Sequence, residues 1–102
     1  MSGTLGTSNP AANTLTTVYT VTTGKAAIFN VSIANNSGYP LVFSLAIAST
    51  STPAASEYIE YNTVLAGNGI YERSGLMASA TKNIVAIAST ANAAINVFGY
   101  EE

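Results

Sequence analysis

Residues 25–48 read KAAIFNVSIANNSGYPLVFSLAIA and contain most of the chain's large apolar side chains. Over 27–34, and again over 41–48, the residues at odd positions form one set and those at even positions form another. Side chains of a strand point alternately to opposite faces, so a period of two places each set on one face of a sheet. The break at 35–38, NNSG, has the composition of a turn. The stretch therefore predicts two strands joined by a turn, and a small all-β domain around them.

Five further stretches have the composition or alternation of strands, and no stretch shows helical apolar spacing over ten or more residues. They are residues 14–22, 57–64, 70–77, 84–89 and 93–100. The 70–77 stretch is interrupted by polar residues and predicts an edge strand or a bulge at Gly75. Short strands with frequent turns predict one antiparallel β-sandwich or barrel over 14–102, with about seven to eight strands. We expect the sandwich, with either a jelly-roll or an immunoglobulin-like connection order, because a resemblance given below also implies it.

Residues 1–13 are small and polar, with Gly and Pro among them, and predict a flexible N-terminal arm. Such an arm is either an untethered terminus or a segment that docks on a neighbouring subunit. The predicted core comes from one face of each strand. Its members are Tyr19, Val21, Phe29, Val31, Ile33, Phe43, Leu45, Ile47, Ile59, Tyr61, Ile84, Ala86, Ile95 and Val97.

Charged residues make up only 8% of the 102 residues, against about a quarter in an average protein. The surface must then consist largely of Ser, Thr, Asn, Gly and Ala, which suits packing against other protein copies. The three basic residues, Lys25, Arg73 and Lys82, are scattered, which argues against nucleic-acid binding. The sequence has no apolar run long enough for a membrane helix and no signal-peptide pattern, so we expect neither.

The chain lacks the residue types on which most enzyme chemistry depends. It has no His, no Cys and no Asp, which removes the usual general base, the thiol nucleophile and the commonest zinc ligands. Glu57 and Glu60 are the nearest approach to a carboxylate pair, but their odd spacing would direct them to opposite faces of a regular strand. We therefore predict no catalytic residue, no metal site and no cofactor.

The tyrosines are the most suggestive side chains for an interaction surface. Tyr58, Tyr71 and Tyr100 fall in expected strands and Tyr39 in an expected turn. Each could be a half-buried strand residue with its hydroxyl in solvent, an interface residue, or a platform on which a sugar ring stacks. Together with Arg73, these four tyrosines form the predicted interface set.

Several segments resemble small β-sandwich virion proteins of tailed bacteriophages. Residues 19–25, YTVTTGK, resemble a "YTVPAGK"-like segment that leads into an alternating strand and an N-x-S/T turn, although Thr22-Thr23 replaces Pro-Ala. LVFSLAIA at 41–48 and EYIEYNTVLAGNG at 57–69 are also similar. The ending at 84–102 corresponds loosely to the family's V-x-A-x-S…F-x-x-x-G-x-E pattern.

This resemblance covers residues 14–102 and implies a non-enzymatic virion protein. The leading expectation is a capsid decoration (cement) protein on the capsid surface, bound to the major capsid protein and other virion proteins. It implies a homo-oligomer, with a trimer favoured by analogy, and neither nucleic-acid nor membrane partners. The alternative is a tail or tail-fibre module that contacts host surface glycans.

Overall fold

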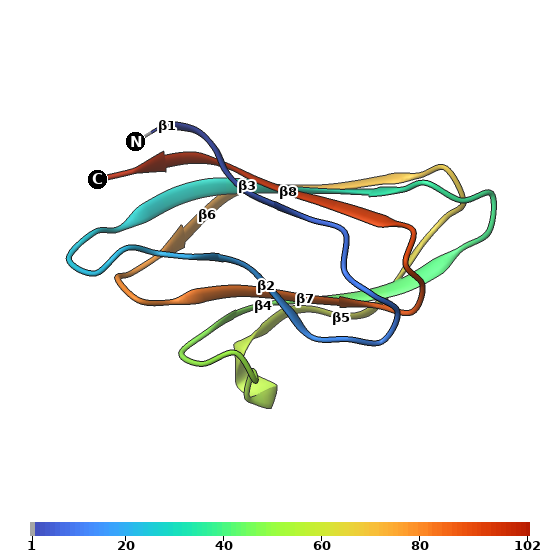
Figure 1. Ribbon diagram of the computed structural model, residues 1–102, viewed down its shortest axis with the longest axis horizontal. Coiled ribbons are helices and arrows are strands. Elements are labelled where there is room, and N and C mark those ends of the chain that lie inside the picture. The colour runs from blue at the N-terminus through green and yellow to red at the C-terminus, as the bar shows by residue number, and fades with distance from the viewer. Residues whose placement is uncertain (1) are drawn as a thin grey trace.

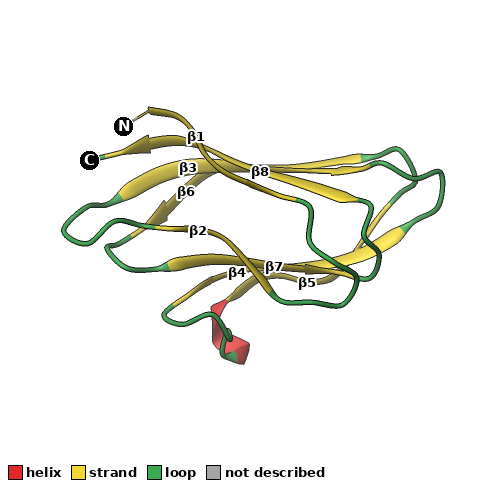
Figure 2. Ribbon diagram, in the orientation of Figure 1, coloured by secondary structure: helices red, strands yellow, loops and turns green. Residues whose placement is uncertain are grey.

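The computed structural model describes residues 2–102, which form two four-stranded antiparallel sheets packed face to face (Figure 1). Sheet A has the strand order β1-β8-β3-β6, and sheet B has the order β2-β7-β4-β5. The strands are β1 (Ser2–Ser8), β2 (Thr16–Thr20), β3 (Ala27–Asn35), β4 (Leu41–Ala48), β5 (Tyr58–Leu65), β6 (Ile70–Ala78), β7 (Asn83–Ala88) and β8 (Ala93–Glu101). A single 3-10 turn, η1 (Ala55–Glu57), follows β4 on the outer side of sheet B (Figure 2). The predicted all-β sandwich is confirmed.

The core fills the space between the two sheets with the alternating residues of the central strands. In β3, Phe29, Val31 and Ile33 are at most 1% exposed, as the period-two pattern predicted. Burying each such aliphatic or aromatic side chain contributes about 1.5–3 kcal/mol before entropy is counted. The predicted core residues that are buried are Val21, Phe29, Val31, Ile33, Phe43, Leu45, Ile84, Ala86, Ile95 and Val97, and Tyr19, Ile47 and Ile59 pack half-buried against them.

Every irregularity in the strand pairing lies on an edge strand. The pairings of β3 with β8 and of β4 with β7, at the centre of each sheet, keep an unbroken register. The four edge strands β1, β2, β5 and β6 each carry at least one extra residue against their partner. Bulges bend and twist an edge, which blocks the addition of a strand from another molecule. The edges of both sheets are therefore poor templates for a strand from another molecule.

Two bulges in β5 overturn the prediction that Tyr61 belongs to the core. Leu45 pairs with Glu60 while Phe43 pairs with Thr63, and a second shift separates Glu60 from Tyr58. Asn62, at the first bulge, has a left-handed φ of 49°. Each extra residue reverses the alternation of faces. As a result the Tyr61 side chain is 66% exposed.

The expectation of a flexible arm over residues 1–13 also needs correction, although Met1 lies outside the described residues. Residues 2–8 form β1, which pairs with β8 from Ser2 opposite Tyr100 to Ser8 opposite Ile95. Its one bulged residue, Leu5, is only 9% exposed and joins the core. The arm therefore docks on the chain's own sheet, and the sandwich has eight strands over the described residues.

The predicted bulge at Gly75 is confirmed, and β6 is an edge strand as expected. Phe29 pairs with Leu76 and Val31 with Arg73, so β6 has one extra residue between these pairs. Gly75 has a φ of 71°, and its amide donates to the Asn30 side-chain oxygen at 3.2 Å. Glycine adopts this left-handed conformation without steric cost, which explains its place at the bulge.

Candidate functional site

Large apolar side chains are exposed on both outer faces and in the loops of the sandwich. They are Leu15, Ile28, Tyr39, Val42, Tyr61, Val64, Ile70, Met77 and Tyr100. Single exposed apolar residues are normal on a protein surface, whereas a contiguous group marks an interaction site. An interaction site therefore requires that several of these residues are neighbours.

Three of them form a continuous row across the outer face of sheet A. Ile28 of β3 lies opposite Tyr100 of β8 on one side and opposite Met77 of β6 on the other. Ile28 is 55% exposed, Met77 70% and Tyr100 48%. Directly opposed residues on one face of a sheet have Cβ atoms about 4.5–5.5 Å apart. We call Tyr100, Ile28 and Met77 the apolar row.

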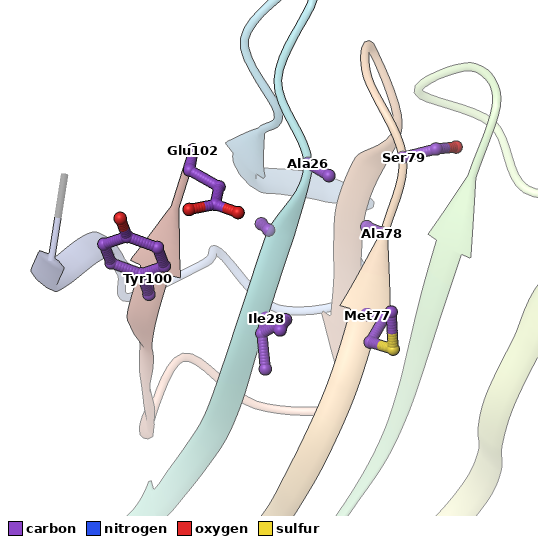
Figure 3. A pocket seen from close by; sticks show the side chains of 8 residues that line it. Ala26, Ile28, Met77, Ala78, Ser79, Tyr100 and Glu102 are labelled. Atoms are coloured by element: carbon purple, nitrogen blue, oxygen red, sulfur yellow. The ribbon is translucent and has the colours of Figure 1, made fainter.

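The apolar row borders a shallow groove with a volume of about 360 Å³. Ala26, Ala27, Ala78, Ser79 and Glu102 complete its lining. In Figure 3 the Glu102 carboxylate extends over the groove near the Tyr100 ring, while Met77 and Ser79 stand on the opposite side. A hydrogen bond to Glu102 and the charge of that carboxylate raise the pKa of Tyr100.

The charge distribution over sheet A is one-sided. In the sequences of its four strands, Arg73 is the one basic residue, and it pairs with Glu60 of sheet B at 2.9 Å. Glu72 and Glu102 are exposed, and no ion pair involving either is present within residues 2–102. The outer face of sheet A therefore combines an apolar row with two carboxylates that make no ion pair among residues 2–102.

The outer face of sheet B is partly covered by the chain itself. Ala46, Ala48 and Val85 alternate with the core residues of β4 and β7, and are nonetheless at most 1% exposed. The connection from residue 49 to residue 57, with η1, contacts β4 on this side (Figure 2). Glu57 tethers this connection by accepting hydrogen bonds from the backbone amides of Ser49 at 3.0 Å and of Ala54 at 2.8 Å. These amides, Ala54 first, lower the pKa of Glu57.

Beside this covering connection, two tyrosines lie together. The rings of Tyr58 and Tyr61 make an edge-to-face contact with centroids 5.0 Å apart. Pro53 and Ala55 complete a shallow hollow around them. Tyr61 reaches this position because of the β5 bulges, so regular alternation could not place it here.

The five residues of the predicted interface set do not form one site. Tyr100 lies in the apolar row on sheet A, Tyr58 lies beside Tyr61 on sheet B, and Tyr39 is 81% exposed in the turn between β3 and β4. Tyr71 and Arg73 come together at the β5–β6 edge, where both bind Glu60. The set thus spreads over four regions of the molecule.

At the β5–β6 edge the side chains hold the two sheets together. The Glu60 carboxylate accepts hydrogen bonds from Thr63 at 2.9 Å, from the Tyr71 hydroxyl at 3.0 Å and from Arg73 at 2.9 Å. Burial raises the pKa of Glu60, but these three donors outweigh burial, and the net effect lowers its pKa. The Tyr71 ring is half-buried and packs on Phe43 with centroids 4.8 Å apart. Tyr71 thus serves the interior of the sandwich.

The opposite edge has a similar carboxylate link, which sequence reasoning missed. Glu101 at the end of β8 is 5% exposed and accepts hydrogen bonds from the Tyr19 hydroxyl and from the Thr22 amide, the latter at 2.7 Å. These donors, Tyr19 first, lower the pKa of Glu101. Burial and the bond to Glu101 raise the pKa of Tyr19. A carboxylate at a chain terminus looks solvated in a sequence, so no sequence signal indicated this contact.

The turn that carries Tyr39 is built on a buried polar residue, Asn35. Its side-chain amide donates to the carbonyl oxygens of Tyr39 at 2.8 Å and of Ala66 at 3.1 Å, joining the β3–β4 and β5–β6 turns. Its side-chain oxygen accepts from the Ser37 amide at 3.1 Å. Buried polar groups are normally satisfied in this way, so Asn35 has a structural role.

Ile28 and Met77 belong to the apolar row but not to the predicted interface set. Both are large apolar residues on the solvent-facing side of their strands. In β3 the other residues of that face are Asn30, Ser32 and Ala34, so the signal was one large apolar residue in an otherwise small and polar set. Their adjacency depends on the pairing of β3 with β6, which the sequence does not reveal.

The described residues offer no obvious chemistry beyond these contacts. Within residues 2–102, no three carboxylate, His or Cys side chains gather in a way that could hold a metal ion. Over the same residues, no helix has the length and apolar character needed to cross a membrane. Comparison of the chain with protein-family models, with curated proteins and with solved structures finds no match.

Proposed function

We propose that this chain is a non-enzymatic structural protein of a phage virion, most readily a capsid decoration (cement) protein. The observation that carries the proposal is the exposed apolar row Tyr100–Ile28–Met77 on a rigid sheet. A cement protein binds a preformed protein lattice, and a flat sheet face with contiguous apolar side chains suits such docking. The absence of His, Cys and Asp from the sequence agrees with a role without catalysis.

We further propose that the sandwich is connected as a jelly roll, which is widespread among viral structural proteins. Its first strand pairs with its last, β2 with β7, β3 with β6, and β4 with β5. This is the pairing expected when one long hairpin is rolled into two sheets. An immunoglobulin-like order would place several consecutive strands side by side, whereas over the described residues only β4 and β5 are both consecutive and paired.

Attachment to a lattice fits the modest size of the apolar row. A contact of three large side chains per copy is weak, but repetition over many sites, or a homo-oligomer that engages several sites at once, raises the effective affinity. A trimer is the favoured oligomer by analogy with the threefold positions of an icosahedral shell. The partners in this proposal are the major capsid protein and other virion proteins on the capsid surface.

The Tyr58–Tyr61 pair supports a second candidate, a tail or tail-fibre module that binds host surface glycans. Exposed aromatic rings beside a shallow hollow can stack on sugar rings. In this edge-to-face arrangement the edge of one ring meets the face of the other, so the two rings do not form a flat platform.

Copy number per particle tests the proposal. Purified virions are analysed by quantitative mass spectrometry with the major capsid protein as the internal reference. Hundreds of copies per virion are expected of a lattice-wide decoration protein. A few copies to a few dozen would favour the tail or fibre candidate, and a glycan array would then test sugar binding by the Tyr61→Ser variant against the parent chain. Absence from virions would overturn both candidates.

A further inference from the structure

The groove beside the apolar row has a composition that selects one kind of occupant. Its floor is aliphatic, with Ile28 and Met77 as the largest side chains, and the Glu102 carboxylate stands at one end beside Tyr100 (Figure 3). We propose that this groove binds a lysine or arginine side chain presented by a partner protein. The aliphatic stem of that side chain lies along Ile28 and Met77, and its charged head meets Glu102.

The stem-and-head arrangement follows from the physical chemistry of long basic side chains. Lysine and arginine bury their methylene groups along apolar surface while the charged end keeps polar contacts. The Tyr100 ring adds an aromatic face close to the same position, and rings of this type attract cations. The volume of about 360 Å³ is at the lower end of the about 300–1,000 Å³ typical of small-ligand pockets, which suits one long side chain.

The charges around the groove favour a partner side chain with a positive charge. The one basic residue in the strands of sheet A, Arg73, is paired with Glu60, whereas the Glu102 carboxylate in the groove makes no ion pair among residues 2–102. A partner with carboxylates at this position would be repelled, while a partner with a basic residue next to apolar ones would complete the face. The inference rests on the proposed function for the nature of the partner, a virion protein, but the groove's preference for a cation does not.

A second copy of this chain is a poorer occupant. In a twofold contact the same patch meets itself, so two Glu102 carboxylates would approach each other, and the one basic residue in the strands of sheet A, Arg73, is already paired with Glu60. Addition of a neighbouring chain to a sheet edge is opposed by the bulge on each edge strand. A heterologous protein with a basic residue avoids both difficulties.

The test uses two short peptides that differ in one charge. Acetyl-Leu-Arg-Leu-amide and the matched acetyl-Leu-Glu-Leu-amide are titrated into the ¹⁵N-labelled full chain, and amide shifts are followed by NMR. The variants are Glu102→Gln, which removes the charge, and Met77→Ser, which removes part of the floor. Val64→Ser, on the outer face of sheet B, is the matched control because Val64 is 67% exposed and remote in the fold from sheet A.

The arginine peptide is expected to give saturable shifts at residues 26–28 and 77–79 and to bind at least about threefold more tightly than the glutamate peptide. Glu102→Gln is expected to weaken arginine-peptide binding about 1.5-fold to fivefold, the range for an exposed ion pair, and to leave the glutamate peptide no weaker. Met77→Ser weakens both peptides, and Val64→Ser weakens neither. Each variant must first give a native, dispersed spectrum.

Four outcomes would overturn the inference: equal affinity for both peptides, no saturable shift, shifts that map elsewhere, or an unchanged affinity in Glu102→Gln. Concentration-dependent shifts at the groove without any peptide would also overturn it, because a second copy would then be the occupant. Failure of the proposed function is a separate result. A chain that prefers the arginine peptide but is absent from virions keeps its cation-binding groove and loses its assigned role.

Discussion

The outer faces of the two sheets differ, although each sheet has four antiparallel strands and an equally buried inner face. On sheet B, Ala46, Ala48 and Val85 are as buried as the core, and the connection over residues 49–57 contacts β4, although Val42 and Val64 of the same face stay exposed. On sheet A, nothing in the described chain covers Ile28 and Met77, and both remain more than half exposed. Apolar residues on a covered face contribute to the stability of the domain. Apolar residues on an uncovered face contribute less, and a contiguous group of them is the feature on which the proposed docking surface rests.

A buried charge on the covered face should have the largest effect. Ala46 is 0% exposed and lies between Val85 of β7 and Tyr58 of β5. Ala46→Asp would place an unpaired carboxylate under η1, and we expect it to lower the free energy of unfolding by about 3–5 kcal/mol. Urea denaturation followed by circular dichroism measures the change.

Met77→Asp is the matched control for this substitution. Met77 is 70% exposed on sheet A, so the new carboxylate stays in water and the free energy of unfolding should change by about 0.5 kcal/mol or less. Equal destabilisation by the two substitutions would show that the faces do not differ in the way that the exposures indicate.

A backbone change next to the apolar row should have an intermediate effect. Gly99 of β8 has a φ of 155°, and a Cβ atom there would lie 2.3 Å from the Ile28 carbonyl oxygen. Gly99→Ala therefore strains the pairing of β8 with β3, and we expect it to lower the free energy of unfolding by about 1–3 kcal/mol. Gly38→Ala is the control, because no atom lies within 4 Å of a Cβ at that position. A Gly99→Ala melting curve that matches the Gly38→Ala curve would contradict this reading of the sheet.

Much of the fold could be predicted from the sequence because the central strands are regular. The alternation of 27–34 and 41–48 identifies β3 and β4 and most of their core residues, since period two has one meaning where the register is unbroken. The bulged edge strands resist the same reasoning. Tyr61 changes face because extra residues in β5 reverse the alternation, and β1 is too small and polar to be recognised as a strand.

The candidate site could be predicted only in part. Tyr100 belonged to the predicted interface set, but its neighbours Ile28 and Met77 did not, because their adjacency arises from pairings between segments far apart in the sequence. Tyr71 and Arg73 were chosen for their residue types, yet the fold directs both to Glu60. Residue type indicates what a side chain can do, whereas register decides which side chains do it together.

The connection over residues 49–57, here called the cover of sheet B, should loosen in acid. Glu57 holds it through the amides of Ala54 and Ser49, and these bonds lower its pKa below the usual 4.5. The unfolded chain then takes up the proton at a higher pH than the folded chain. The stabilisation by Glu57 is therefore complete above pH 4.5 and is lost as the pH falls through the folded-state pKa. NMR titration should show the Ser49 and Ala54 amide shifts moving with this pKa. In Glu57→Gln the two amides should lose that titration and exchange faster with solvent at neutral pH.

The local amides separate this effect from the other two carboxylates whose pKa values are lowered, Glu60 and Glu101. Those groups link the edges of the sandwich, so their protonation lowers global stability without releasing the cover alone. Amides of β3 and β8 in sheet A should keep their protection in Glu57→Gln. If they exchange faster together with Ser49 and Ala54, the cover is not an independent unit.

The smallest effect on stability is expected on the apolar row itself. Met77→Ser removes a side chain that is 70% exposed, so the free energy of unfolding should change by about 0.5 kcal/mol or less. The corresponding change in melting temperature is at most about 2–4 °C for a domain of this size. A loss well above that range would mean that Met77 packs within the isolated chain and needs no partner. A neutral result, together with weaker peptide binding by the same variant, would separate what this residue does for the fold from what it does for recognition. Such a result would support the proposal that the apolar row contributes to docking more than to the stability of the isolated domain.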